Sequence, residues 1–237
     1  MIYPSESDRY PWIDDSILSD IESDDEWMKD EVARCVDEPW YWLCNYVFSV
    51  RKDEFTNDGK PEVLRFPPRE HLRITFDRCF RENRLAIDKS RQMTLSWVMM
   101  AYCLYWLQFG KNEEIICQTK KEEDVGALIG RAYFMLTSQR EWLRPKFDYR
   151  SGKGGKIVVY GVDGRSLNTI QGIPGGAGAG DQIRSKNPSR YFLDEGGFVD
   201  EFDECRTNAE SCTNDIKIVS TANMGDYELF MNDRLAG

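Results

Sequence analysis

Residues 85–96 read LAIDKSRQMTLS, and this stretch decides the fold. The short apolar run from Leu85 to Ile87 predicts a strand. Ser96 to Phe109 is long, apolar and free of glycine, which predicts a buried helix that ends at Gly110. The residues between them therefore join a strand to the N-terminus of a helix. Because the free N–H groups and the dipole of a helix N-terminus both favour negative charge, the sequence predicts a phosphate-binding loop.

The loop departs from the Walker A pattern G-x-x-x-x-G-K-[ST]. Laid over that pattern, Lys89 stands at the first glycine, Thr94 at the second and Leu95 at the lysine. Ser96 alone keeps the expected residue type. The pattern by itself is a weak match, and the alternative is an ordinary strand-to-helix turn with Lys89 and Arg91 in solvent.

Strand and helix patterns alternate along the rest of the chain. Further strands are predicted at Ile115 to Cys117, Ile157 to Tyr160, Tyr191 to Leu193 and Ile216 to Val219, and helices over residues 69–82 and from Glu122 to about Leu143. This alternation is typical of an α/β fold with a mostly parallel sheet and helices on its faces. The sequence QGIPGGAGAGDQIRSKNP, residues 171–188, predicts a long loop. We expect a flexible lid or a subunit contact there, because no strand or helix is predicted beside the glycines.

The length of 237 residues allows one α/β domain with an appendage. Residues 1–60 hold 16 of the 41 Asp and Glu and 6 of the 31 Lys and Arg, which leaves 25 of each sign in residues 61–237. We therefore expect an acidic, mobile arm over residues 1–30, an N-terminal helical region over 31–84 and the core over 85–237. No apolar run approaches the ~20 residues of a membrane span, and the acidic start is unlike a secretion signal. Seven cysteines without C-x-x-C spacing favour a reducing cytoplasm.

The run Tyr191-Phe192-Leu193-Asp194-Glu195 is an apolar strand that ends in two carboxylates, as in a Walker B motif. At the end of a strand beside a phosphate loop, Asp194 could hold Mg²⁺ and Glu195 could polarise a water that attacks a phosphate. A buried strand that ends in Asp-Glu also occurs by chance, and an ordinary strand end is the alternative.

The sequence KSRQMTLSW after an apolar strand resembles the ATP-binding loop of large terminases, in which an S-R-Q core is common. In some large terminases the loop lysine stands at the start of the motif. The resemblance implies that Lys89 contacts the β and γ phosphates, that Ser96 and Asp194 hold Mg²⁺, and that Arg91 is a tether or a second cation. The implied ATP-binding loop comprises Lys89, Ser90, Arg91, Gln92, Met93, Thr94, Leu95 and Ser96.

The same resemblance implies two further parts of the site. Ser220, Thr221 and Ala222 follow the last predicted strand and match the motif that couples loss of the γ-phosphate to DNA movement. Arg184 stands ten residues before Asp194, where terminases carry an arginine that can reach a neighbouring subunit's nucleotide. A DNA-contacting or solvated arginine is the alternative.

The likeness covers about residues 66–230 and implies a P-loop NTPase of the ASCE, RecA-like class, without the nuclease domain that large terminases also carry. It implies ATP and Mg²⁺ as cofactors, and double-stranded DNA, a portal protein, a small terminase subunit and a homo-oligomeric ring as partners, on a procapsid in the host cell cytoplasm. Base stacking is expected from Phe66, Pro67 and Arg69, or from Tyr41 or Trp42. The competing interpretations are a helicase or other nucleic-acid translocase, and a degenerate nucleotide-binding assembly module.

Overall fold

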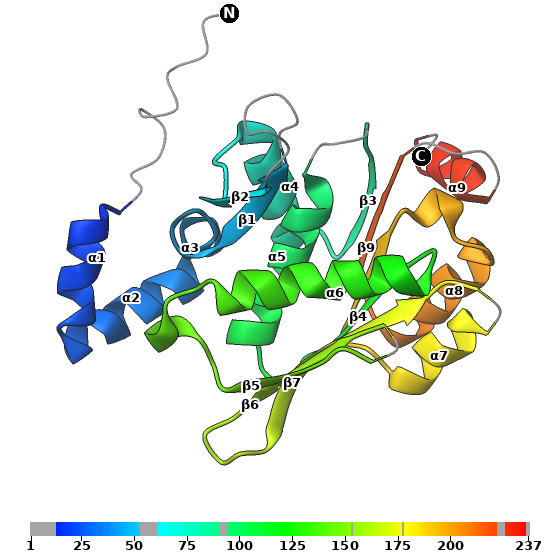
Figure 1. Ribbon diagram of the computed structural model, residues 1–237. Coiled ribbons are helices and arrows are strands. Elements are labelled where there is room, and N and C mark those ends of the chain that lie inside the picture. The colour runs from blue at the N-terminus through cyan, green and yellow to red at the C-terminus, as the bar shows by residue number, and fades with distance from the viewer. Residues whose placement is uncertain are drawn as a thin grey trace, which may run out of the picture. The chain divides into compact units, whose positions relative to one another are not determined.

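The computed structural model describes residues 13–52, 61–90, 94–152, 154–176, 178–221 and 226–235 (Figure 1). The chain forms two compact units, one of Met1–Ile74 with Phe134–Arg144 and the other of Thr75–Tyr133 with Pro145–Gly237. Among the described helices, none combines the length and the apolar composition needed to cross a membrane.

The N-terminal unit consists of short helices and a hairpin. Its elements are α1 (Asp15–Glu22), α2 (Asp25–Asp37), α3 (Pro39–Tyr46), the antiparallel strands β1 (Phe48–Lys52) and β2 (Pro61–Arg65), the start of α4 (Glu70–Arg81), the end of α6 (Glu122–Thr137) and the 3-10 turn η2 (Glu141–Leu143). The buried carboxylate of Glu31 accepts hydrogen bonds from the hydroxyls of Tyr41 and Tyr46.

Helices α1 and α2 lie where the sequence favoured a mobile arm, of which residues 1–12 fall outside the described residues. Each helix begins after an aspartate whose side chain accepts a backbone N–H of the first turn: Asp14 from Ser16 and Asp24 from Glu26. Leu18 is buried, so α1 has an apolar contact despite its acidic composition. The acidic composition therefore did not indicate these two capped helices.

The C-terminal unit is built on a seven-stranded sheet in the order β3-β9-β8-β4-β7-β6-β5. The strands are β3 (Arg84–Asp88), β4 (Glu114–Thr119), β5 (Phe147–Arg150), β6 (Lys156–Tyr160), β7 (Ser166–Pro174), β8 (Arg190–Asp194) and β9 (Asp215–Ser220). The helices are the rest of α4, α5 (Leu95–Phe109), most of α6, α7 (Ala179–Lys186), the 3-10 turn η3 (Gly196–Phe198), α8 (Phe202–Cys212) and α9 (Asp226–Leu235). The pairs from β3 through β7 are parallel, and β6 and β5 join antiparallel.

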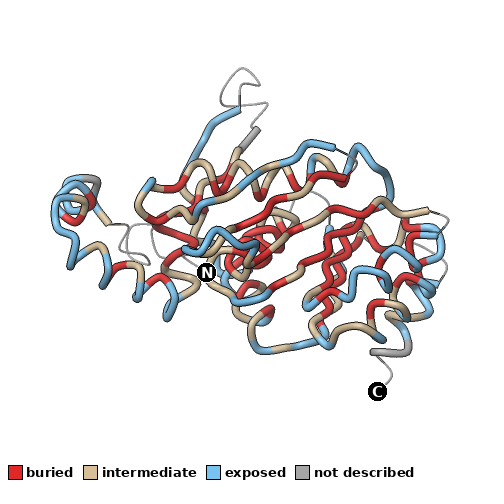
Figure 2. Tube along the Cα trace, turned by 90° about the horizontal axis from the view of Figure 1, so that it is seen from below, coloured by how far each residue is buried: buried red, intermediate tan, exposed pale blue. Residues whose placement is uncertain are grey.

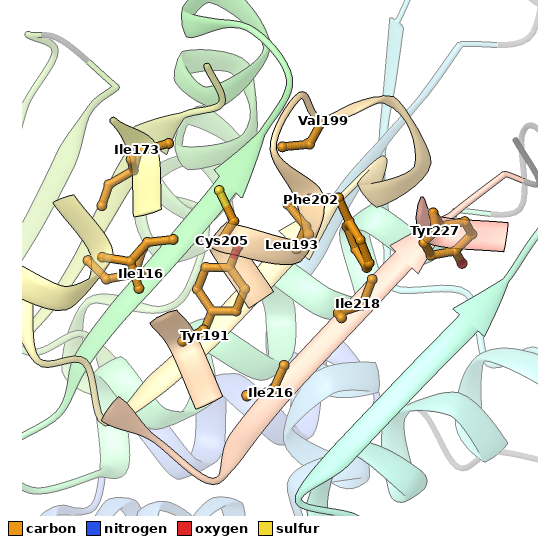
Figure 3. Close-up of a cluster of buried hydrophobic side chains, with 13 residues drawn as sticks. Ile116, Ile173, Tyr191, Leu193, Val199, Phe202, Cys205, Ile216, Ile218 and Tyr227 are labelled. Atoms are coloured by element: carbon orange, nitrogen blue, oxygen red, sulfur yellow. The ribbon is translucent and has the colours of Figure 1, made fainter. Parts of the chain in front are cut away.

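Helices cover both faces of this sheet, and its central strands are buried (Figure 2). On one face, Ile216 and Ile218 of β9 join a cluster with side chains of α7 and α8 (Figure 3). Lys217, between them in the strand, faces the other way, with its ammonium 5.3 Å from the ring centre of Tyr102 on α5. Helix α6 lies on the α5 face of β7, where any side chain at Gly172 would clash with Val125.

The predicted α/β class and the mostly parallel sheet are confirmed, including the strands around Leu85, Ile115, Ile157, Tyr191 and Ile216. The long loop predicted over residues 171–188 is wrong, because β7 runs to Pro174 and α7 begins at Ala179. The predicted helix from Glu122 ends at Thr137, and η2 follows.

Candidate functional site

Three parallel strands bring the predicted motifs to one edge of the sheet. β3 pairs with β9 so that Asp88 lies opposite Ser220, and β9 pairs with β8 so that Val219 lies opposite Asp194. The backbone N–H of Lys89 donates to the carbonyl of Ser220 at 2.8 Å. The residues that follow these strands therefore meet at the carboxyl edge, where ligands of open α/β sheets bind.

Lys89 lies at the centre of this edge. Its ammonium nitrogen is 3.6 Å from Oδ1 of Asp194 and 3.3 Å from Oε1 of Glu195. The same nitrogen is 3.4 Å from Oγ of Ser96 on the first turn of α5. The side chains of Lys89 and Asp194 are 10% and 8% exposed, whereas that of Glu195 is 38% exposed. The displaced lysine, the loop hydroxyl and both carboxylates thus form one cluster.

The backbone of the loop explains how the unusual pattern can fold. Thr94, which stands at the second glycine of the Walker A pattern, has φ of 60°, in the left-handed region that favours glycine. Leu95, at the pattern's lysine position, is 4% exposed and begins α5, so its side chain belongs to the core. Lys89, in contrast, directs its ammonium towards the acidic pair. Ser90 is exposed, and Arg91, Gln92 and Met93 lie outside the described residues.

Glu195 also has a left-handed backbone, with φ of 55° directly after β8. Non-glycine residues held in this region are strained, and such residues often mark functional sites. The turn is held by Ser220, which is fully buried and whose hydroxyl accepts the N–H of Gly197 at 2.9 Å. The hydroxyl of Thr221 donates to Oε2 of Glu195 at 3.3 Å. Two of the predicted coupling residues therefore contact the acidic turn, and Ala222 lies outside the described residues.

A pocket of about 450 Å³ opens at this cluster, a size suited to a small ligand. Its lining includes predicted residues, namely Lys89, Ser96, Asp194, Glu195 and Thr221. It also includes residues that the sequence analysis missed, namely Thr119, Lys120, Asp124, Ala127, Arg131 and Phe198. Most of these come from the end of β4 and from α6. Since β4 is parallel to β8, the start of α6 must lie at the carboxyl edge too. The predicted strand at Ile115 to Cys117 and the helix after it could have indicated these residues.

Arg184 is not part of this cluster. It lies on α7, its side chain is 62% exposed, and it pairs with Asp181 one turn earlier in the helix. It does not line the pocket described above. Its predicted catalytic role is therefore not supported by proximity within the chain.

The start of the loop is fixed from the other side by α9. The hydroxyl of Tyr227 donates to Oδ1 of Asp88, the residue before Lys89, at 2.7 Å. Burial of Tyr227, followed by this hydrogen bond and the negative charges of Asp88 and Glu195, raises the pKa of its hydroxyl well above the usual value. The hydroxyl is therefore a neutral donor across the physiological range.

The residues expected to stack on a base belong to the N-terminal unit. Phe66 and Trp42 are fully buried there, and the guanidinium of Arg34 lies 3.7 Å from the ring centre of Tyr41. These two buried side chains have no exposed face on which a base could stack in this conformation.

No protein-family model and no curated protein matches the sequence. Solved structures do match. The large terminase of bacteriophage HK97 has a TM-score of 0.58 at 14% identity, over 85% of this chain and 41% of that chain. The large terminase of a thermophilic bacteriophage has a TM-score of 0.52 at 16% identity, over 70% of this chain and 42% of that chain. The large terminase ATPase domain of a Thermus phage has a TM-score of 0.47 at 14% identity, over 61% of each chain.

This chain spans about two fifths of the first two proteins, 41% and 42% of their lengths. In its own sheet, β9 lies between the strand of the phosphate loop and the strand of the acidic pair, as in ASCE folds. The strand order, the strand–loop–helix junction at Lys89 and these two structures agree, and the chain has the P-loop ASCE fold of phage large terminases.

Proposed function

We propose that this chain is the ATPase motor domain of a viral large terminase and hydrolyses ATP to move double-stranded DNA into a procapsid. The observation that carries the proposal is the cluster at the carboxyl edge, where Lys89 lies within 3.6 Å of oxygens from both Asp194 and Glu195 and 3.4 Å from Ser96. A loop cation, a hydroxyl at a helix N-terminus and an acidic pair are the parts that phosphoryl transfer requires.

ATP binding would exchange the partners of Lys89. In this structure its ammonium pairs with the two carboxylates. A triphosphate on the first-turn N–H groups of α5 would offer Lys89 a stronger anionic partner and release Asp194. The site residues that carry this step are therefore Lys89 and the N-terminus of α5.

The donor set at this edge fits Mg²⁺. Ser96 and Asp194 supply a hydroxyl and a carboxylate oxygen near one point, and both are donor types that Mg²⁺ prefers. Among the described residues no group of three or more His, Cys, Asp or Glu could hold a metal alone. An ion at this edge would therefore share its coordination with phosphate oxygens and would neutralise charge on them.

Glu195 is the proposed general base. Its strained backbone aims the side chain into the pocket, where its carboxylate is more exposed than that of Asp194 and can reach a water. The hydrogen bond from Thr221 fixes one carboxylate oxygen and connects the base to the end of β9. A change at the γ-phosphate would thus reach the coupling segment through Glu195.

The packaging role adds partners that lie outside this chain: double-stranded DNA, a portal protein, a small terminase subunit and further copies in a ring, on a procapsid in the host cell cytoplasm. The fold likeness to two large terminases supports this role. The exposed position of Arg184, away from the pocket of its own chain, supports action on the nucleotide of a neighbouring copy.

The test is to separate movement along intact duplex from strand separation in the full-length protein. One assay follows ATP-driven displacement of a third strand from a triplex, and a parallel assay follows release of one strand from a duplex. Displacement without strand release is expected of a packaging motor. Strand release would replace the proposal with a helicase, and ATP binding without either activity would favour an assembly module.

A further inference from the structure

Two basic side chains of the pocket belong to none of the nucleotide motifs. Lys120 follows β4 and Arg131 lies on α6, and both line the pocket that holds Lys89 and the acidic pair. We refer to these two residues as the basic wall. Lys120 is exposed, whereas Arg131 is partly buried, so a charge near Arg131 is screened less by solvent.

Each member of the basic wall rests beside one of the two motifs. The guanidinium of Arg131 lies 5.9 Å from the ring centre of Trp97, which directly follows Ser96 in the first turn of α5. The ammonium of Lys120 lies 5.9 Å from the ring centre of Phe198, three residues after Glu195. Contacts of this length hold a cation loosely in place and leave its hydrogen-bond donors free for another partner.

The pairing of charges in the pocket is uneven. Lys89 pairs with Asp194 and with Glu195. Neither side chain of the basic wall makes an ion pair or a hydrogen bond with another described residue, although both make the ring contacts above. The carboxylates of Asp194 and Glu195 thus share one ammonium, whereas the two cations of the basic wall have no ionic partner of their own in the described part of the chain. These cations favour a ligand with an anionic end.

We propose that Lys120 and Arg131 bind the terminal phosphate of the nucleotide within the same chain and so make the pocket prefer ATP to ADP. This inference rests on the proposed function. The base and ribose are uncharged, so the phosphate chain is the part of ATP that satisfies two cations. With the β-phosphate at the start of α5, the chain of phosphates leads towards Glu195, beside which Phe198 holds Lys120.

The same chemistry could serve a phosphate of the DNA backbone, because Lys and Arg bind both. The two sources differ in one measurable respect. A contact to the terminal phosphate changes the preference for ATP over ADP in the absence of DNA, whereas a contact to DNA leaves that preference unchanged and alters DNA affinity.

The experiment is calorimetry of the full-length protein with Mg²⁺ and either ADP or a non-hydrolysable ATP analogue. The wild type is expected to bind both, with preference for the ATP analogue. Arg131→Ala is expected to weaken binding of the ATP analogue about tenfold or more, because it removes one charge-assisted contact. Its affinity for ADP should stay within about twofold of wild type. Lys120→Ala should act in the same direction but less, because Lys120 is more exposed.

Arg131→Lys and Lys121→Ala are the matched variants. Arg131→Lys keeps the charge and should restore part of the preference, and Lys121→Ala removes a neighbouring lysine that does not line the pocket and should change nothing. Equal losses for both ligands would show that Arg131 only shapes the pocket and would overturn the inference, as would an unchanged preference with weaker DNA binding. If the wild type binds neither ligand, the proposed function itself fails, whatever the variants do.

Discussion

At the amino edge of the central strands, Arg190 and Lys217 are enclosed by Glu113 and Asp215, whereas at the carboxyl edge Lys89 alone pairs with Asp194 and Glu195. Both clusters join Lys or Arg to Asp and Glu at the ends of the same parallel strands. Their surroundings differ in burial, in the number of partners and in the space beside them.

The amino-edge cluster is closed. Arg190 donates to both carboxylate oxygens of Glu113 at 3.1 Å, pairs with Asp215, and lies 3.7 Å from the ring centre of Trp106. Lys217 is 1% exposed, and its ammonium donates to Asp215 at 2.6 Å and to two backbone carbonyls. Every charge there has a partner of opposite sign, and no ligand is needed.

The carboxyl-edge cluster is open. Lys89 has contacts of 3.3 to 3.6 Å, longer than the hydrogen bonds of the amino edge, and it lines a pocket of about 450 Å³. Glu195 and Thr94 hold left-handed backbones beside it. The difference teaches that a functional charge cluster is recognised by loose pairing, strain and adjoining space rather than by its residue types.

The largest effect that follows from this comparison is on turnover. Glu195→Gln removes the proposed base and is expected to lower the ATP hydrolysis rate by roughly 10²- to 10⁴-fold, with nucleotide affinity retained. The measurement is steady-state phosphate release beside calorimetric binding, with the full-length protein assembled. Retained turnover would remove Glu195 from the base role and weaken the contrast between the two edges.

The amino-edge cluster should contribute to the stability of the fold rather than to turnover. Arg190→Met leaves Glu113 and Asp215 without their shared cation, and we expect a loss of about 3–5 kcal/mol in the free energy of unfolding, because a broken buried pair leaves uncompensated charge. Urea unfolding measures it. The matched control is Arg84→Met at the start of β3. The side chain of Arg84 is 42% exposed and lies 3.8 Å from the carboxylate of Glu210. This substitution should lower the free energy of unfolding by less than about 1 kcal/mol. Equal effects would contradict the contrast.

Mg²⁺ should raise the stability of the protein only where it can take the place of a removed ammonium group. Lys89→Ala removes the ammonium between Asp194 and Glu195, so Mg²⁺ is expected to stabilise this variant without nucleotide. At a concentration roughly ten times its dissociation constant the gain is about 1.4 kcal/mol. Thermal unfolding with and without Mg²⁺ measures it. The wild type and Arg190→Met should show no comparable shift, and a shift of the same size in either would argue against exchange at Lys89.

The smallest effect concerns the contact between α9 and the loop. Tyr227→Phe removes one hydrogen bond to Asp88 and should lower the free energy of unfolding by about 1 kcal/mol near neutral pH. Because the pKa of Tyr227 is raised in the folded protein, its contribution is complete below the unfolded value of about 10 and is lost as pH rises further. The difference between wild type and variant should therefore shrink above about pH 10, which unfolding curves at neutral and alkaline pH would reveal. A difference that stays constant would mean that the pKa of the Tyr227 hydroxyl is not raised in the folded protein.

Much of the sheet could be predicted because its central strands are short apolar runs. β7 could not, since its buried positions include Asn168 and Gly172. Asn168 is satisfied by the carbonyls of Leu107 and Gly110 and by the N–H of Glu113, a segment about 55 to 61 residues away in the sequence. Such partners are set by the tertiary fold and leave no local pattern.

The motif residues of the site could be predicted because they belong to local sequence patterns. Lys89 follows β3, Ser96 lies in the first turn of α5 and Asp194 is the last residue of β8. Their place at the carboxyl edge therefore follows from strand direction. The basic wall was missed because Lys120 and Arg131 match no motif. Their importance depends on sharing a pocket with residues more than 20 positions away along the chain.

The central claim is that Lys89 is the cation of a displaced phosphate loop, and Mg²⁺-dependent ATP binding by calorimetry tests it most directly. Wild type, Lys89→Ala and the exposed surface control Lys111→Ala should be compared. We predict that the wild type and Lys111→Ala bind ATP with the same affinity and that Lys89→Ala abolishes binding. Binding by Lys89→Ala at wild-type affinity, or no binding by the wild type, would contradict the account.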